Sequence, residues 1–91
     1  MDVVPMALKN DDNYYYDIVR ANIRKYRVEK KYTQQKLADE CELSVDYIAE
    51  IESLRRRKSF SLATLGRIAD VLNINIKEFF NDIDDNKLNK L

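Results

Sequence analysis

Hydrogen-bonding and charged side chains gather in three stretches near the middle of the chain. Residues 33–35 and 44–50 offer hydroxyls, amides and carboxylates, and four consecutive cations follow at Arg55–Lys58. Such groups donate or accept hydrogen bonds, and cations pair with anionic oxygens, without forming covalent bonds. The three stretches therefore predict reversible binding of a charged partner that presents a specific arrangement of hydrogen-bonding groups.

Residue types that support catalysis or metal binding are scarce. The sequence has no histidine, so it lacks a His-based triad and an imidazole ligand. Its one cysteine, Cys41, cannot build a zinc finger or an internal disulfide, and we expect it to fill the core as a small hydrophobe. A single glycine excludes a glycine-rich phosphate loop. We expect no enzyme activity, no metal and no cofactor.

Two short helices must position the polar stretches. Thr33 and Ser44 are favoured N-cap residues, and an apolar set recurs after them at helical spacing. That set consists of Leu37, Ala38, Leu43, Ile48 and Ile51. Two helices joined by a tight turn, with polar groups facing outward, are typical of a helix-turn-helix, whose second helix lies in the major groove of duplex DNA. The pattern predicts a recognition helix over about 44–53 in a transcriptional regulator, which we expect to be a repressor.

Three more helices complete the expected fold. The first runs from 14–17 to about 30, and Ser61 begins a fourth, which Asn73 ends in a left-handed conformation. Asn75 and Glu78 resemble a capping box that opens a fifth helix. The sequence therefore predicts an all-α, five-helix domain.

The composition suits such a small helical domain. The chain has 91 residues, of which 45% are hydrophobic, and glycine and proline occur once each. Gly66 falls inside a predicted helix, where close packing against another helix would explain it. The formal net charge is zero, which counts mildly against DNA binding, although residues 14–72 hold 12 Lys/Arg against 9 Asp/Glu.

The chain divides into three parts by composition. We expect a flexible arm over 1–13, the DNA-binding domain over 14–81, and a polar tail over 82–91 that could extend the last helix. No apolar run is long enough to span a membrane, and the N-terminus does not read as a signal peptide. We expect a cytoplasmic protein that has no membrane partner.

Residues 23–80 resemble the Cro/phage-repressor helix-turn-helix family, the XRE type. The matching segments are IRKYRVEKKYTQQKLADE, LSVDYIAEIE and FSLATLGRIADVLNINIKEFF, in the order and spacing of the family. The resemblance implies the five-helix phage-repressor-like fold and binding of double-stranded DNA.

The resemblance also implies a role for individual positions. Gln34 matches a residue that contacts a phosphate while its amide points at the recognition helix, and Thr33 and Gln35 lie near the same phosphates. Arg27 and Glu52 match a buried ion pair between the first and third helices. The positions that match exposed residues of the recognition helix are Ser44, Val45, Asp46, Tyr47 and Glu50.

Two departures from the family pattern affect the turn and the loop. Glu42 stands where the family usually has glycine, so a left-handed turn there would cost about 1 kcal/mol. The loop after the third helix is longer and carries Arg55, Arg56, Arg57 and Lys58. In the family this loop follows the phosphate backbone, although the same cations could form a solvated loop that only steers DNA.

The recognition helix is unusually acidic for a surface that faces DNA. Asp46 and Glu50 could accept hydrogen bonds from cytosine N4, or they could repel the phosphates. Val45 could contact a thymine methyl group. Tyr47 could bind a phosphate or sugar, or it could be partly buried packing.

A second copy and a rival function are also open. One recognition helix offers few base contacts, so we expect a homodimer on a roughly palindromic site. Phe79, Phe80 and Ile83 exceed what so small a core requires, and we expect them at the dimer interface. The rival is a protein-interaction module or antitoxin of the same fold with weak DNA binding. Salt-dependent binding to random duplex DNA would separate the two.

Overall fold

Four α-helices and a short 3₁₀-helix follow one another in the computed structural model, which describes residues 5–82. They are α1 (Tyr14–Glu29), α2 (Gln34–Cys41), α3 (Val45–Glu52), α4 (Leu62–Leu72) and the 3₁₀-helix η1 (Ile76–Phe80). No strand occurs within this described part of the chain. The prediction of an all-α fold is confirmed, but the fifth helix is a 3₁₀-helix, and the α-helices within residues 5–82 number four.

Side-chain caps begin three of the α-helices. The hydroxyl oxygens of Thr33, Ser44 and Ser61 each accept the backbone N–H three residues further on, at 3.0 Å. These bonds satisfy amides that the first helical turn leaves without a partner. Asn73 ends α4 with φ 57° and ψ 45°, which is the left-handed conformation predicted for it.

The segment after α4 does not continue as an α-helix. Asn75 Oδ1 accepts from the backbone N–H of Lys77 at 3.0 Å, while the Glu78 carboxylate accepts from Asn81 Nδ2 at 2.7 Å. The predicted capping box between Asn75 and Glu78 is therefore wrong. Buried Asn22 on α1 donates from Nδ2 to the backbone carbonyls of Phe79 and Asn81, at 2.8 and 2.9 Å. Such a short, tightly held segment suits a 3₁₀ turn.

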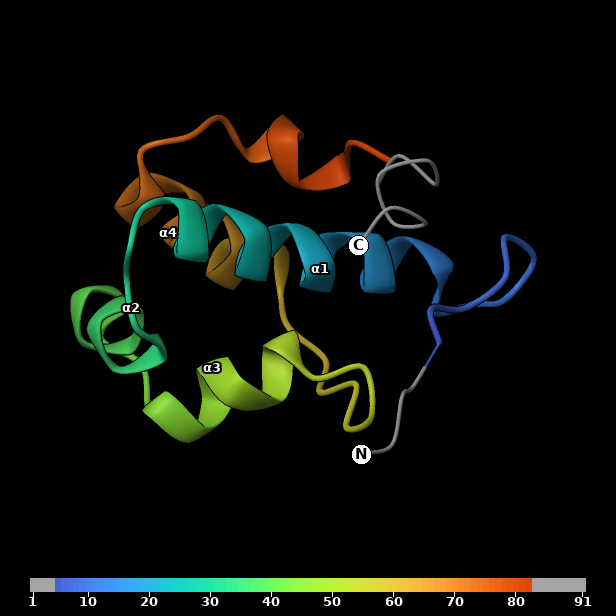
Figure 1. Cartoon of the computed structure of the whole chain (residues 1–91), viewed down its shortest axis with the longest axis horizontal. Coiled ribbons are helices and arrows are strands. Elements are labelled where there is room, and N and C mark those ends of the chain that lie inside the picture. The colour runs from blue at the N-terminus through green and yellow to red at the C-terminus, as the bar shows by residue number, and fades with distance from the viewer. Residues whose placement is uncertain (1–4, 83–91) are drawn as a thin grey trace.

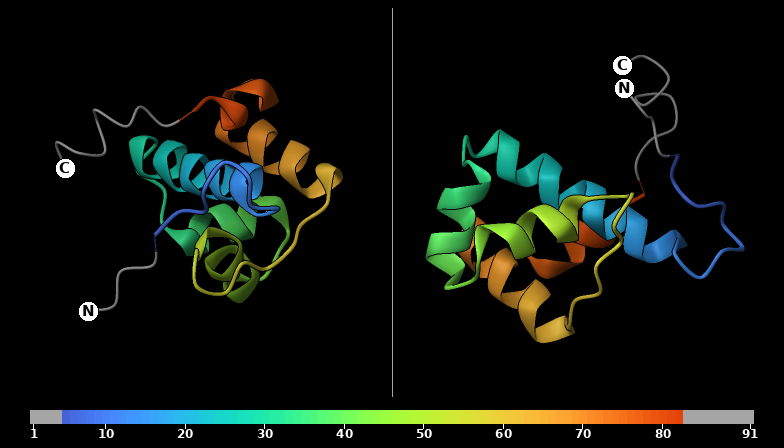
Figure 2. Two further views of the ribbon diagram at one scale, coloured as in Figure 1. Left: turned by 90° about the vertical axis from the view of Figure 1, so that its right-hand side faces the viewer. Right: turned by 90° about the horizontal axis from the view of Figure 1, so that it is seen from below.

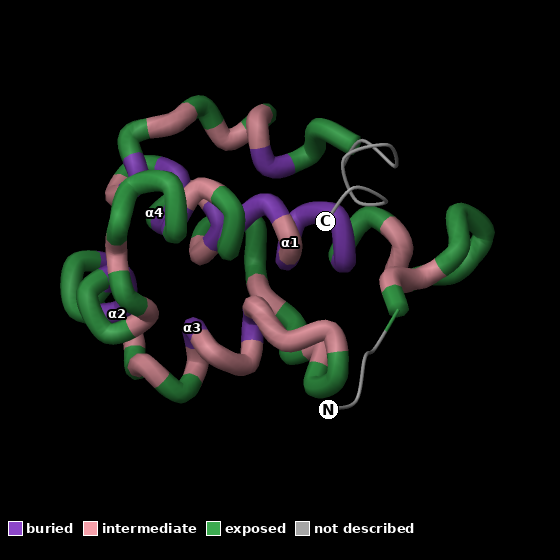
Figure 3. The backbone as a smooth tube through the Cα atoms, viewed as in Figure 1, coloured by how far each residue is buried: buried purple, intermediate pink, exposed green. Residues whose placement is uncertain are grey.

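Helix α1 runs through the middle of the molecule, with η1 along one side and the α2–α3 pair along the other (Figure 1). In Figure 3 the buried stretches of the backbone lie on the sides of the helices that face one another. The buried core cluster consists of Val19, Ile23, Leu37, Ala38, Cys41, Ile48, Ile51, Leu65, Ile68, Ala69, Leu72 and Phe79. Cys41 is thus a core residue, as expected, and burial raises the pKa of its thiol.

Phe79 belongs to this core and not to an accessible interface. Its side chain is fully buried, and its ring packs edge-on against Tyr26 at a centroid distance of 6.1 Å. The prediction that Phe79 lies at a dimer interface is wrong, because the turn of η1 directs Phe79 inward and leaves its neighbour Phe80 half-exposed. Ile83, predicted at the same interface, lies outside the described residues.

The ends of the described chain differ from the middle. Residues 5–8 have no regular secondary structure, and residues 9–13 form turns and a bend. The Asp11 N–H donates to the Leu8 carbonyl at 2.8 Å and the Tyr14 N–H to the Asp11 carbonyl at 3.0 Å. The predicted tail over 82–91 lies outside the described residues except for residue 82. Within 5–82, none of the helices has both the length and the apolar character needed to cross a membrane.

Gly66 does not mark a close helix contact. A Cβ atom added at this position would meet no atom within 4 Å, so the close packing expected from the sequence is wrong. We expect Gly66→Ala to raise the free energy of unfolding by about 0.5–1 kcal/mol, because alanine loses less backbone entropy in a helix interior. Urea unfolding followed by circular dichroism measures this change. A destabilised variant would mean that the surroundings of Gly66 are tighter than they are in this structure.

Candidate nucleic-acid interface

The turn between α2 and α3 sets the angle of the candidate recognition helix. Glu42 has φ 58° and ψ 41°, so a non-glycine residue occupies the left-handed position. Its backbone N–H donates to the carbonyls of α2, and the Leu43 N–H donates to the Ala38 carbonyl at 2.9 Å. These bonds close the C-terminus of α2, and Ser44 then caps α3. The glycine that the family favours is absent, yet the turn keeps its left-handed geometry.

The residues predicted to contact DNA lie on three adjoining segments: the start of α2, the outer side of α3, and the loop 53–60. Those that are exposed are Thr33, Gln35, Ser44, Asp46, Arg55, Arg56 and Lys58. Those that are half-buried are Gln34, Val45, Tyr47, Glu50 and Arg57. Viewed from below, α2, α3 and the loop face the reader together in the right panel of Figure 2.

A buried ion pair joins α1 to the end of α3. Arg27 donates from Nε to Glu52 Oε2 at 2.7 Å and from Nη2 to Oε1 at 3.0 Å, so the guanidinium binds the carboxylate with two parallel bonds. The two side chains are 9% and 3% exposed. Gln34 Nε2 donates to the same Glu52 oxygen at 3.1 Å, which adds the first residue of α2. Helices α1, α2 and α3 therefore meet at one carboxylate.

This contact leaves Gln34 oriented as the resemblance implied. Its amide is directed at Glu52 on α3, and the backbone N–H groups at the start of a helix such as α2 favour an anion. Gln35 on the next position donates to Asp39 at 2.8 Å on the helix surface. Thr33 uses its oxygen as the N-cap, which leaves its hydroxyl hydrogen free to rotate.

The acidic side chain of Glu50 has a partner that the sequence analysis did not identify. Arg56 Nη1 lies 2.7 Å from Glu50 Oε2, and the two side chains are 62% and 29% exposed. The cation offsets the negative charge on the outer side of α3. In the sequence, the signal for this pair was that Glu50 and Arg56 carry opposite charges six residues apart, with the end of α3 between them. Only the path of the loop brings the two side chains together.

One aliphatic and one aromatic residue of α3 contribute both to packing and to the surface. Val45 and Tyr47 are half-buried against the core cluster. The Tyr47 hydroxyl lies 3.4 Å from the Ser59 carbonyl, which is a long hydrogen bond to the loop. Asp46 is exposed in the first turn of α3, where its negative charge interacts favourably with the positive end of the helix dipole. Asp46 therefore has a local structural role beside any contact with a base.

The four cations of the loop do not share one environment. Arg57 turns inward, with φ 48°, and donates from Nη2 to Asp17 Oδ2 at 2.9 Å and from Nε to Oδ1 at 3.2 Å. Arg56 pairs with Glu50, and Arg55 and Lys58 are exposed. Asp17 was not identified from the sequence, because its partner lies 40 positions away.

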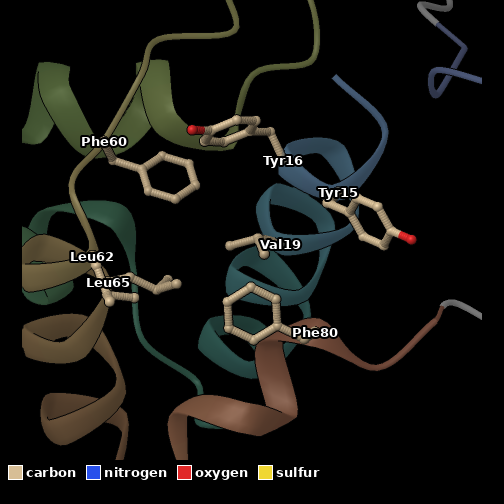
Figure 4. Close-up of a pocket in the computed structure, with 7 residues that line it drawn as sticks. All are labelled: Tyr15, Tyr16, Val19, Phe60, Leu62, Leu65 and Phe80. Carbon is tan, nitrogen blue, oxygen red and sulfur yellow. The ribbon is translucent and has the colours of Figure 1, made fainter. Parts of the chain in front are cut away.

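An apolar groove lies where the start of α1, the loop 53–60, α4 and η1 meet (Figure 4). It is lined by Tyr15, Tyr16, Val19, Phe60, Leu62, Leu65 and Phe80. Tyr15, Leu62 and Phe80 are 62%, 70% and 48% exposed. Two tyrosines at the start of α1 therefore border a groove together with residues from the loop, α4 and η1.

The comparisons with known proteins agree with this geometry. A model of a helix-turn-helix family, HTH_3, matches residues 23–79. The chain belongs to this helix-turn-helix family. Members of the XRE and Cro type are DNA-binding transcriptional regulators, and DNA-binding regulation is accordingly the function of this HTH_3 protein. A comparison with curated protein sequences gives no significant match.

Solved structures share the arrangement of this HTH_3 domain. The restriction–modification controller protein C.Esp1396I is 31% identical over 74% of this chain and 84% of its own, with a TM-score of 0.66. The controller protein C.AhdI from Aeromonas hydrophila is 26% identical over 71% and 96%, with a TM-score of 0.65. SinR, a master regulator for biofilm formation solved in complex with DNA, is 25% identical over 69% and 98%, with a TM-score of 0.62.

Proposed function

We propose that α3 lies in the major groove of duplex DNA, that the start of α2 and the loop 53–60 contact the flanking phosphates, and that the protein is a cytoplasmic, homodimeric repressor. The observation that carries the proposal is the bonding between these segments. Gln34 bonds to Glu52, Arg56 to Glu50, and the Tyr47 hydroxyl to the Ser59 carbonyl, so the three segments form one continuous surface. An α-helix flanked by anion-binding groups fits a major groove bordered by phosphates.

The phosphate contacts come from groups that face outward. We assign them to the backbone amides at the start of α2, beginning at Gln34. We also assign them to the side chains of Thr33, Gln35, Arg55, Arg56 and Lys58. Arg57 is left out of this set because Asp17 holds its guanidinium. Occupation of an operator by a bound domain obstructs access of polymerase to the same DNA, which is why repression is the proposed direction of control.

Base contacts fall to the outer residues of α3. Ser44 and Asp46 are exposed there, and Val45 and Glu50 are half-buried. With Arg56 balancing its charge, Glu50 can accept from cytosine N4 without leaving a lone anion in the groove. We therefore propose cytosine opposite Glu50, with Tyr47 contributing a sugar or phosphate contact at the edge of α3.

The homodimer is assigned to the apolar groove around Phe80. A helix of eight residues reaches few base pairs, so useful specificity requires two copies on one site. The exposed aromatic and aliphatic side chains of the groove supply an apolar surface for a second copy of the chain. The groove includes Phe60 of the loop 53–60, but it includes none of the side chains assigned to phosphate or base contacts, so we expect both surfaces to be occupied together.

Selection of bound sequences from a random duplex library tests the function. We expect enrichment of a roughly palindromic site, with half-sites about one helical turn apart and cytosine at the position facing Glu50. If no sequence is enriched and random duplex does not bind at low salt, the protein-interaction module becomes the better assignment.

Repeating the selection with the Glu50→Ala variant tests the role of this one residue in base preference. We expect the preference at the position facing Glu50 to fall by about 1–3 kcal/mol, while affinity for random duplex rises because Arg56 is released. Asp70→Ala is the matched control, since it removes the same charge from an exposed position on α4. An unchanged preference in the Glu50→Ala variant would remove Glu50 from the base contacts.

A further inference from the structure

The basic loop after α3 is anchored from the inside by its third cation. Arg57 has φ 48°, a left-handed backbone conformation that non-glycine residues rarely adopt. Its guanidinium donates hydrogen bonds to both carboxylate oxygens of Asp17. The Arg57 backbone N–H also donates to the Ser53 carbonyl at 3.0 Å, which closes the start of the loop. These bonds raise the pKa of Arg57, chiefly because Asp17 accepts its hydrogen bonds. The loop is therefore ordered around Arg57.

Asp17 is a fully buried carboxylate whose charge is matched by several donors. Besides Arg57, it accepts the backbone N–H of Ala7 at 3.0 Å, and Arg20 Nε lies 3.6 Å from its Oδ1. A buried charge is tolerated only when it is paired and hydrogen-bonded. Asp17 thus joins α1, the segment 5–13 and the loop at a single side chain.

Arg20, one turn further along α1, holds the same loop by its backbone. It is 2% exposed and donates from Nη1 to the Ile51 carbonyl at 2.9 Å and to the Lys58 carbonyl at 2.7 Å. Burial lowers the pKa of Arg20, and Asp17 opposes that effect. The last turn of α3 and the far end of the loop are therefore fixed to one point on α1.

We propose that Arg57 is a positioning residue of the DNA interface: paired with Asp17, it holds the loop beside the end of α3 so that the neighbouring cations meet the phosphates. Arg57 itself makes no phosphate contact. The inference rests on the proposed function, because it concerns how the DNA-binding loop is held. It divides four consecutive cations into one anchor and three outward-facing groups.

The salt dependence of DNA binding separates an anchor from a phosphate contact. Each phosphate contact contributes close to one unit to the slope of log affinity against log salt concentration. We compare Arg57→Gln with Lys58→Gln, its matched neighbour, in the full chain on a random-sequence duplex. We expect Arg57→Gln to lower affinity roughly 3–10-fold at every salt concentration with an unchanged slope, because the loop must be ordered on binding. Lys58→Gln should reduce the slope by about one.

Amide hydrogen exchange supplies a readout that does not depend on DNA. In Arg57→Gln, exchange should accelerate at Ala7 and across 53–58, while α2 and α3 keep their protection. If this variant does not fold, Arg57→Lys takes its place, with intermediate affinity expected because lysine lacks the planar fork that binds both oxygens.

Three results would overturn the inference: a slope reduced in Arg57→Gln as much as in Lys58→Gln, unchanged affinity in Arg57→Gln, or wild-type affinity in Arg57→Lys. Failure of the wild-type chain to bind random duplex at low salt would instead overturn the proposed function.

Discussion

Replacing Arg27 by methionine is expected to lower the free energy of unfolding by about 3–5 kcal/mol. The change removes the bidentate partner of Glu52, whose side chain is 3% exposed, and leaves this buried carboxylate with the Gln34 amide as its one remaining side-chain donor among residues 5–82. Loss of the pair also removes one of the contacts that join α1 to α3. Urea unfolding followed by circular dichroism gives the difference directly.

The double variant Arg27→Met/Glu52→Met is the control for this prediction. It removes both charges at once, so we expect it to recover most of the stability lost in Arg27→Met. Gln34 also loses its acceptor in the double variant, so DNA binding should remain weaker than in the wild type even where stability returns. A loss below about 1 kcal/mol in Arg27→Met would mean that Glu52 reaches solvent when its partner is removed.

Phe80→Asp is expected to give a folded monomer that binds its operator about 10²–10⁴-fold more weakly. The Phe80 side chain is 48% exposed at the border of the apolar groove. A carboxylate in its place should therefore oppose contact with a second copy without entering the core. Two linked recognition helices bind far more tightly than one, because the second binding event is intramolecular. Sedimentation equilibrium gives the oligomeric state, and titration of the selected operator gives the affinity.

Val28→Asp provides the matched control for Phe80→Asp. Val28 is a 53% exposed apolar residue of α1 that does not line the groove, so the same kind of substitution there should leave both the dimer and operator binding intact. A Phe80→Asp protein that still sediments as a dimer would place the interface elsewhere.

The features that depended on near neighbours were predictable from the sequence. A hydroxyl at an N-cap acts on an amide three residues away, which is why Thr33, Ser44 and Ser61 could be assigned from type and spacing alone. The apolar period placed Leu37, Ile48 and Ile51 in the core for the same reason. The capping box at Asn75 was the exception, because the Asn75 side chain accepts from the Lys77 N–H and the Glu78 carboxylate accepts from Asn81.

The features that depended on distant partners required the tertiary structure. Four consecutive cations look equivalent in sequence, but Arg57 meets Asp17 across 40 positions, and Arg56 meets Glu50 only because the loop folds back on α3. Phe79 and Phe80 are chemically alike, and only packing of η1 on α1 decides which is core and which is surface.

The sequence by itself determined the helix-turn-helix, because caps, turn and apolar period act over a few residues. Which polar side chains remain available to DNA was decided only by the fold, because burial and ion pairing depend on groups that the chain brings together from far apart.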